Sequence, residues 1–274
     1  MVGGGAEILR RGRAGAAAVR AYLQTLRGRV VAGVDEAGRG ALAGPVVAAA
    51  VILPPGARLR GLADSKALNP AARERLYRRI RDRALAVGVG WAEAGAVDAV
   101  NVLQATLMAM SQAVAGLRPP PEVVLVDGTA APPLPVPCRT IPKGDALVPL
   151  ISAASIVAKV TRDRLMADLA GRYPEYGFER HKGYGTADHQ AALRRHGPCP
   201  VHRTTFAPVR AALHERHRRA QLGLPGIAPQ DEAAPAESKG ERPKPKVSGE
   251  GGAEASLFVG GVTEGAQAAE GRMP

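Results

Sequence analysis

Two adjacent carboxylates, Asp35 and Glu36, follow an apolar run in residues 34–40, which read VDEAGRG. Successive side chains of a strand point to opposite faces, so one of the two acids would face inward, where an unpaired charge is costly. A divalent cation bound between them would remove that cost. For an isolated pair, however, an ordinary polar turn that ends a strand would be the better interpretation.

Two further acids occupy comparable positions and favour the metal site. Asp127 ends a second apolar run, and Asp145 follows Lys143 and Gly144 just before a segment rich in small residues. Carboxylates at the ends of neighbouring strands meet at one edge of a sheet, and three or four of them form an all-oxygen site that suits Mg²⁺ or Mn²⁺ rather than zinc. Two such ions about 4 Å apart can activate water and stabilise the leaving oxygen of a phosphodiester. Asp145 also suits the N-cap of the next helix, and the two roles are compatible.

Several basic and hydroxyl side chains suit a ligand that carries phosphates. In Gly38-Arg39-Gly40, glycine lets the backbone approach a ligand closely and arginine adds a cation. The other candidate phosphate contacts are Lys66 in Asp64-Ser65-Lys66, Ser152 with Ser155 and Lys159 on one predicted helical face, Lys182 and Arg203. A plain loop before a helix explains residues 64–66 equally well, and tight packing is the alternative for the serines.

Other residues that often carry chemistry receive structural interpretations. Four histidines lack the spacing of zinc ligands, and Cys199 does not complete a set. We interpret them as loop residues that bind backbone: His181, His189, His196 and His202. Asp163 lies between two arginines and is predicted to be an ion-pair residue, and Trp91, the one tryptophan, is predicted to be in the core.

The apolar pattern predicts the elements that position these side chains. Residues 70–83 fit a helix with Asn69 as its N-cap and Pro70 at its first position. The remaining predicted helices are 6–27, 97–117 and 149–171, and the strands are 29–34, 46–53, 86–93 and 122–128. This order implies an α/β fold with a mixed sheet flanked by helices. A loop-rich basic stretch, residues 173–210, follows.

The net charge of +12 is unevenly distributed. Residues 221–274 hold 8 acidic and 5 basic side chains, a net of −3, so the first 220 residues carry +15. Such an excess suggests a polyanionic partner, because Lys and Arg gain free energy by releasing counterions from phosphates. Charge alone fits a merely basic protein equally well.

The C-terminal residues are predicted to be disordered, because 16 of the last 54 are Gly or Pro and periodicity is lost. Residues 221–225 (QLGLP) are similar to the short peptide that binds bacterial sliding clamps, but Pro225 replaces its aromatic anchor. Without that anchor a chance match is favoured.

The composition also bears on the compartment. There is no run of about 18 apolar residues, so no membrane span is expected. The N-terminus lacks the basic-then-apolar order of a signal peptide. Cys138 and Cys199 are too few for a disulfide framework. We expect a cytoplasmic monomer.

Taken together, these segments resemble ribonuclease HII, the type 2 ribonuclease H family, across residues 28–212. So many separated matches in the correct order are specific, although no single one would be. Ala41 stands where the family often has proline. The matching segments are residues 34–40, 42–46, 64–66, 126–128, 143–145, 151–163, 181–186 and 202–209.

The resemblance implies that Asp35, Glu36, Asp127 and Asp145 form the catalytic set that binds two Mn²⁺ or Mg²⁺ ions. The implied reaction is hydrolysis of the RNA strand of RNA–DNA hybrids and cleavage 5′ of ribonucleotides embedded in duplex DNA. Water is the nucleophile, and the products carry a 3′-hydroxyl and a 5′-phosphate.

The resemblance also implies a ribonuclease H-like fold with a small C-terminal helical part, and recognition of the ribose 2′-hydroxyl by the Gly38-Arg39-Gly40 backbone and Tyr184. An enzyme that separates RNA from DNA must contact that hydroxyl. We predict an N-terminal basic helix in residues 1–27, a catalytic domain in 28–215 and a disordered tail in 216–274.

Two other functions fit parts of this pattern. A transposase or junction resolvase places clustered acids on a similar sheet but needs no residue that recognises a 2′-hydroxyl, so Tyr184 and residues 38–40 discriminate against it. A hybrid-binding protein without catalysis would favour neutral or basic residues in place of the four acids.

Overall fold

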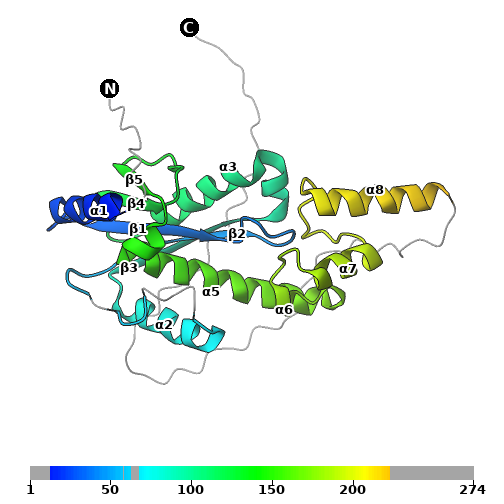
Figure 1. Ribbon diagram of the computed structural model, residues 1–274, viewed down its shortest axis with the longest axis horizontal. Helices are drawn as coiled ribbons and strands as arrows, with labels where there is room; N and C mark the ends of the chain where they lie inside the picture. The colour runs from blue at the N-terminus through cyan, green and yellow to red at the C-terminus, as the bar shows by residue number, and fades with distance from the viewer. Residues whose placement is uncertain (1–12, 58, 63–67, 223–274) are drawn as a thin grey trace, which may run out of the picture. The chain divides into compact units, whose positions relative to one another are not determined.

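A computed structural model of the chain describes residues 13–57, 59–62 and 68–222. Within these ranges five strands form one sheet in the order β3-β2-β1-β4-β5 (Figure 1). Strand β1 pairs antiparallel with β2 and β2 antiparallel with β3, whereas β4 and β5 continue the sheet parallel to β1. The predicted mixed sheet is confirmed. The strands are β1 (Val31–Ala37), β2 (Val46–Ile52), β3 (Ala86–Ala92), β4 (Val123–Asp127) and β5 (Cys138–Ile141).

Helices cover both faces of this sheet. In Figure 1, α3 lies on one side of the strands and α5 with α2 on the other. The helices are α1 (Arg13–Thr25), α2 (Pro70–Arg83), α3 (Ala94–Ala115), α4 (Gly144–Leu147), α5 (Pro149–Arg172), α6 (Phe178–His181), α7 (Ala187–His196) and α8 (Ala207–Gln221), with a 3-10 turn at Pro174–Tyr176.

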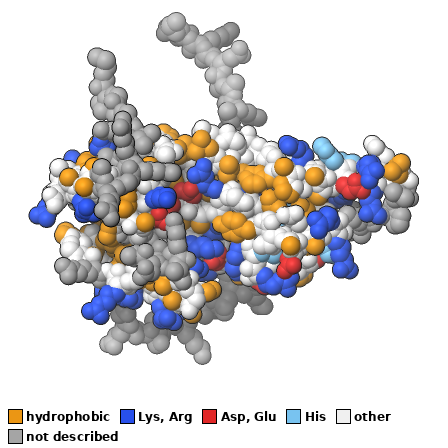
Figure 2. Space-filling view, in the orientation of Figure 1, with side chains coloured by type: hydrophobic (Ala, Val, Ile, Leu, Met, Phe, Trp, Pro, Cys, Tyr) orange, Lys and Arg blue, Asp and Glu red, His pale blue; other side chains and the backbone are white. Residues whose placement is uncertain are grey.

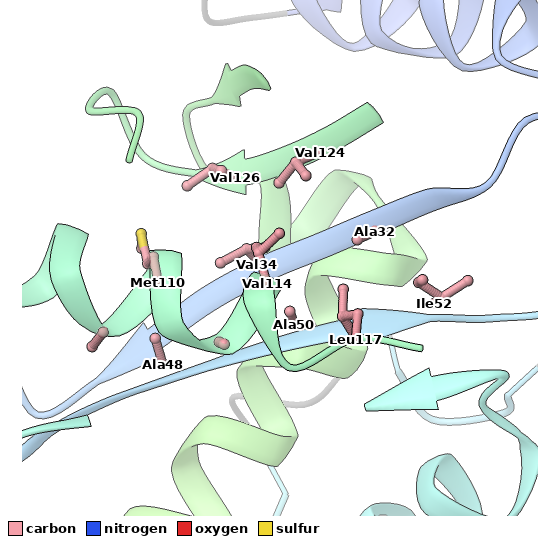
Figure 3. Packing of buried hydrophobic residues seen from close by; sticks show 12 residues of the cluster. Ala32, Val34, Ala48, Ala50, Ile52, Met110, Val114, Leu117, Val124 and Val126 are labelled. Atoms are coloured by element: carbon pink, nitrogen blue, oxygen red, sulfur yellow. The ribbon is translucent and has the colours of Figure 1, made fainter. Parts of the chain in front are cut away.

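Strand β2 is buried along its whole length because both of its faces are covered. Ala48 and Ala50 pack on the face of α3, in a cluster with Met110 of that helix and Leu117, which follows it (Figure 3). The intervening residues, such as Ala49, belong to the cluster on the α5 face. A strand buried on both faces shows a continuous apolar run instead of alternation, which explains the sequence VVAAAVI.

The start of α5 lies directly against β1. A Cβ placed on Gly33 would be 2.2 Å from the carbonyl carbon of Leu150, so this approach requires glycine. The contact fixes the first turns of α5 beside the strand that carries Asp35 and Glu36. The site therefore depends on a helix and a strand packed backbone to backbone.

The helix boundaries follow local capping. The predicted limits of α2 are confirmed, and the Asn69 side chain accepts a hydrogen bond from the Ala72 N–H at 2.8 Å. Helix α3 starts three residues before the predicted position 97 and is interrupted at Asn101, whose φ is 69°. The Asn101 side chain accepts from the N–H groups of Leu103 and Gln104, so it caps a second helical segment.

The C-terminal part is more helical than the predicted loop-rich stretch. Helices α6 and α7 and the start of α8 fall within residues 173–210. Ala192 of α7 packs against the buried cluster that contains Tyr176 and Phe178, whose rings stack with centroids 5.4 Å apart. Helix α8 continues to Gln221, six residues past the predicted boundary at 215. Residues 223–274, with most of the clamp-like peptide, lie outside the described residues.

Trp91 is 45% exposed, so the prediction that it belongs to the core was wrong. It shares a sheet face with Val87 and Val89, which pack against the α5-face cluster, but it is not part of that cluster. Strand β3 is the edge of the sheet. The strand pattern alone does not reveal where helical cover stops.

Basic side chains are spread over the surface, in agreement with the charge excess. Figure 2 shows Lys and Arg at many positions of one face, including the regions of α2 and α8 in Figure 1. Among the described helices, none is long and apolar enough to cross a membrane.

Candidate active site

The four predicted acids come from neighbouring elements. Asp35 and Glu36 lie near the C-terminal end of β1. Asp127 is the final residue of β4, which runs parallel to β1. Asp145 lies in the short helix α4 that follows β5. The Gly144 N–H donates to Oδ1 of Asp127 at 2.6 Å, which ties α4 to the end of β4.

These acids perturb one another electrostatically. Burial, and then repulsion from Glu36 and Asp127, raise the pKa of Asp35 well above its usual value. Burial and repulsion from Asp145 raise the pKa of Asp127. Burial also raises the pKa of Glu36, and a hydrogen bond from Arg39 partly offsets it. The chain thus gathers negative charge that a cation would stabilise.

The donor set fits Mg²⁺ or Mn²⁺, because it consists of carboxylate oxygens only. The side chains nevertheless do not form a closed set: within the described residues no three His, Cys, Asp or Glu are arranged to hold one ion. Two of the acids make local contacts instead. Oδ1 of Asp35 accepts from the Glu36 N–H at 2.7 Å, and Oε1 of Glu36 lies 3.2 Å from Nη1 of Arg39. Binding would require these side chains to turn.

A cavity of about 420 Å³ opens beside Glu36. The side chains that line this cavity suit a phosphodiester, because the hydroxyl groups offer hydrogen-bond donors and the cations offer positive charge. Besides Glu36 it is lined by Ala37, Gly38, Arg39, Gly40, Arg73, Ser155, Ile156, Lys159 and Tyr184.

The predicted Gly38–Gly40 turn borders this cavity. Gly38 has a φ of +93°, and its carbonyl accepts from the Ala41 N–H at 3.3 Å. A Cβ added at Gly40 would meet nothing within 4 Å. The first glycine is therefore required by the fold of the turn, whereas the second leaves open space next to the cavity.

Tyr184 lines the same cavity from the loop between α6 and α7. Its loop is bound to the segment after the turn: Ala41 bridges to Tyr184, and the Leu42 N–H donates to the Gly183 carbonyl at 2.8 Å. The ring faces two cations, with its centroid 5.2 Å from Cζ of Arg162 and 5.7 Å from Nζ of Lys159. Its 36% exposure shows that it does not close over the core.

Two fully buried arginines hold the turn and the loop together, and sequence reasoning missed both roles. Arg162 donates to the carbonyls of Ala43, Pro45 and Lys182. Arg203 donates to the carbonyls of Arg39 and Gly44, so its interpretation as a phosphate contact was wrong.

The sequence contains one signal for the role of Arg162. It stands four residues from Ala158 and four from Met166, both of which are buried on the same face of α5. An arginine at i, i+4 spacing within a buried helical face must find acceptors inside the protein.

The other predicted contacts are placed differently. Ser152 is buried and its hydroxyl donates to the Asp145 carbonyl, so Ser155 and Lys159, and not Ser152, line the cavity. Lys182 does not line it and has a left-handed backbone with a φ of 52°. Lys66 lies outside the described residues. Asp163 is confirmed as an ion-pair residue, although its partners are Lys159, 2.6 Å away, and Arg73, 4.0 Å away, and not its neighbours in sequence.

A mixed sheet with acids at the ends of adjacent parallel strands, next to a cationic cavity, defines a nuclease of the ribonuclease H-like class. Comparisons with known proteins agree. The sequence profile of ribonuclease HII matches residues 32–209. The chain belongs to the ribonuclease HII family, and it is an endoribonuclease that degrades the RNA of RNA–DNA hybrids.

Individual relatives support this assignment. The chain is 62% identical over 184 residues to ribonuclease HII of Paracidovorax citrulli. The aligned residues make up 67% of this chain and 77% of that protein. Ribonuclease H2 from Pyrococcus horikoshii superposes with a TM-score of 0.59 at 31% identity, over 69% of this chain and 99% of that one. Ribonuclease HII from Archaeoglobus fulgidus, solved as a complex with PCNA, superposes with a TM-score of 0.56 at 27% identity. The match covers 65% of this chain and 96% of that one.

Proposed function

We propose that the chain hydrolyses the phosphodiester 5′ of a ribonucleotide, both in RNA–DNA hybrids and at single ribonucleotides embedded in duplex DNA. One observation carries the proposal: Glu36 lines the same cavity as the Gly38–Gly40 turn and Tyr184. A phosphodiester held beside the acids would therefore place its neighbouring ribose against the turn and the tyrosine.

In this proposal, two Mn²⁺ or Mg²⁺ ions are held by Asp35, Glu36, Asp127 and Asp145. When bound, the ions lower the cost of attack by water and stabilise the charge on the leaving oxygen. The mutual repulsion of the acids supports this role, since it favours cation binding. Arg39 pairs with Glu36 and would be available to a phosphate if Glu36 held an ion instead.

The side chains that line the cavity would bind and orient the substrate. Lys159 and Arg73 contribute positive charge, and Ser155 contributes a hydroxyl. These groups hold the phosphate for in-line attack by water, which inverts the phosphorus and leaves a 3′-hydroxyl and a 5′-phosphate. No side chain needs to form a covalent intermediate.

The ribose would be recognised by the turn and by Tyr184. The Arg39 carbonyl accepts from Arg203 at 2.9 Å. In a trans peptide the C=O and the next N–H point in opposite directions, so the Gly40 N–H points away from Arg203 and would donate to a 2′-hydroxyl. The Tyr184 phenol supplies a second hydrogen bond, and its ring packs on the neighbouring deoxyribose.

We propose that the chain acts as a cytoplasmic monomer, in keeping with the free thiols of Cys138 and Cys199. We do not propose that it binds a sliding clamp. The Archaeoglobus enzyme was solved with PCNA, but residues 221–225 of this chain lack the aromatic anchor of a clamp-binding peptide.

The test is cleavage of an end-labelled DNA duplex that contains one ribonucleotide, compared with the same duplex made only of DNA. With Mn²⁺ or Mg²⁺ we expect a single cut on the 5′ side of the ribonucleotide and a 3′ end that a polymerase extends. Chelation of the metal should abolish the cut. Comparable cutting of the all-DNA duplex would contradict the proposal, as would cleavage of long hybrids only.

A further inference from the structure

Three histidines are buried together behind the Tyr184 loop. His189 is fully buried, and His181 and His202 nearly so. The rings of His181 and His189 stack with centroids 4.4 Å apart, and Nε2 of His189 lies 3.0 Å from Nε2 of His202. Among the described residues no three His, Cys, Asp or Glu side chains are close enough together to hold a metal ion. The cluster therefore needs an explanation other than a metal.

The hydrogen-bond partners assign the protonation of the His189–His202 pair. The Cys199 backbone N–H donates to Nδ1 of His202 at 3.0 Å, so that nitrogen is an acceptor and the proton of His202 is on Nε2. Nδ1 of His189 lies 3.0 Å from the Tyr184 carbonyl, which only accepts, so His189 carries its proton on Nδ1. Nε2–H of His202 then donates to Nε2 of His189.

His181 supports the same loop separately. Its Nε2–H donates to the Tyr176 carbonyl at 2.7 Å, and its Nδ1 accepts from the Gly183 N–H at 3.3 Å. Its own carbonyl accepts from the Tyr184 N–H at 3.0 Å. The backbone of Tyr184 is thus held at its N–H from one side and at its carbonyl from the other.

The hydrogen bonds that run from Cys199 through His202 and His189 to the Tyr184 carbonyl form a chain, which we call the relay. The two ends of the relay connect the elements that border the cavity. At one end, the Tyr184 carbonyl accepts from His189 and also from the Thr186 N–H at 2.8 Å. At the other end, Cys199 begins a segment whose Val201 carbonyl accepts from the Gly44 N–H at 2.8 Å. That segment is therefore fixed to the chain that follows the Gly38–Gly40 turn.

We propose that His189 and His202 are positioning residues for ribonucleotide recognition: their relay fixes the Tyr184 backbone relative to the Gly38–Gly40 turn, so that the phenol meets a single 2′-hydroxyl. This inference rests on the proposed role of Tyr184. Burial, together with repulsion from His189, lowers the pKa of His202 to about 3, and burial lowers the pKa of His189, so both rings are neutral when the enzyme works.

A matched pair of variants tests the relay. Asn and Leu have similar size, but only Asn places an N–H near the position of Nδ1. His189→Leu should lower the rate on a single embedded ribonucleotide at least tenfold more than the rate on a long hybrid. His189→Asn should restore the ratio of the two rates to within about threefold of the wild type, since it keeps the donor to the Tyr184 carbonyl. Equal ratios in the two variants would overturn the relay.

A double-variant comparison separates the relay from the role of Tyr184. The quantity compared is the ratio of the rate on a single embedded ribonucleotide to the rate on a long hybrid. If His189 acts through Tyr184, His189→Leu should not lower this ratio further in a Tyr184→Ala background. A normal ratio in Tyr184→Ala would overturn recognition by Tyr184, and the relay with it. A lowered ratio in Tyr184→Ala with a normal ratio in His189→Leu would overturn the relay alone.

A spectroscopic measurement on the wild-type protein tests the relay even if the variants fail to fold. Long-range ¹H–¹⁵N correlation of ¹⁵N-histidine-labelled protein at neutral pH reports which ring nitrogen carries the proton. We expect the Nδ1–H form for His189, which free histidine disfavours, and the Nε2–H form for His202. An Nε2–H form at His189 would overturn the proposal.

Discussion

Gly38 lies against the buried side chain of Arg162: a Cβ placed on Gly38 would be 1.9 Å from Nε of Arg162. Arg162 has little freedom to move away, since its guanidinium donates to three carbonyls, those of Ala43, Pro45 and Lys182. The turn that follows Glu36 and the loop that carries Tyr184 are therefore built around one buried cation.

Gly38→Ala should disrupt both turn and activity. The positive φ and the contact with Arg162 together predict a loss of about 2–4 kcal/mol in unfolding free energy. Cleavage of every substrate should fall, because the turn moves. Gly40→Ala is the matched control: it has open space, so its unfolding free energy should stay within about 0.5 kcal/mol of the wild type. Denaturant titrations compare the two, and equal stability would refute the packing argument.

Tyr184→Ala should slow cleavage of a single embedded ribonucleotide more than cleavage of a long hybrid, where other 2′-hydroxyls are available. A buried tyrosine would cost about 3–5 kcal/mol on truncation, but Tyr184 is 36% exposed and should cost much less. Tyr184→Phe removes only the hydroxyl and should reproduce most of the selectivity loss. Equal slowing on both substrates with a large fall in Tm would return Tyr184 to a packing role.

Asp98 should stabilise the C-terminal part in a pH-dependent way. Its carboxylate accepts from the N–H and hydroxyl groups of both Thr204 and Thr205. Although burial opposes it, these hydrogen bonds lower the pKa of Asp98. The stabilisation is therefore complete above the unfolded pKa near 4 and is lost as the pH falls through the folded value.

Because these hydrogen bonds are exposed to solvent, Asp98→Ala should lower the unfolding free energy by only about 1–2 kcal/mol at pH 7. Urea titrations at pH 7 and pH 3 check this expectation. The difference between variant and wild type should shrink at pH 3, and a difference that is constant across this range would show that packing, not charge, accounts for the effect.

Ending the chain after Leu222 should leave turnover on naked duplex unchanged. Helix α8 ends at Gln221, and its one buried residue is Val209, so the shortened chain retains the helix. Single-turnover cleavage by the full and shortened proteins provides the comparison. A slower shortened enzyme would mean that residues beyond 222 belong to the catalytic domain, against the predicted tail.

Much of the fold could be predicted because local chemistry determines it. Asn69 and Pro70 define the start of α2, and the continuous apolar run of β2 identifies a strand covered on both faces. The acids were identifiable for a similar reason, since Asp35 and Asp127 both end apolar runs and parallel pairing of β1 with β4 brings them to one edge.

What the sequence did not reveal depends on contacts between distant segments. Arg203 donates to the carbonyl of Arg39, 164 residues away, and no local pattern encodes that pairing. The relay through His189 and His202 is equally hidden, because spacing can exclude zinc but does not show which backbone groups the rings bind. The kink at Asn101 also contradicts the apolar periodicity on which one helix was predicted.

The central claim is that the clustered acids hold the metal ions that drive hydrolysis, and Asp127→Asn tests it most directly. Asn keeps an oxygen that accepts from the Gly144 N–H but removes one charge from the repelling set. Cleavage of the single-ribonucleotide duplex in Mn²⁺ should fall on the order of a thousandfold, while the Tm without metal should be unchanged or raised. Near-normal turnover by Asp127→Asn would contradict the account.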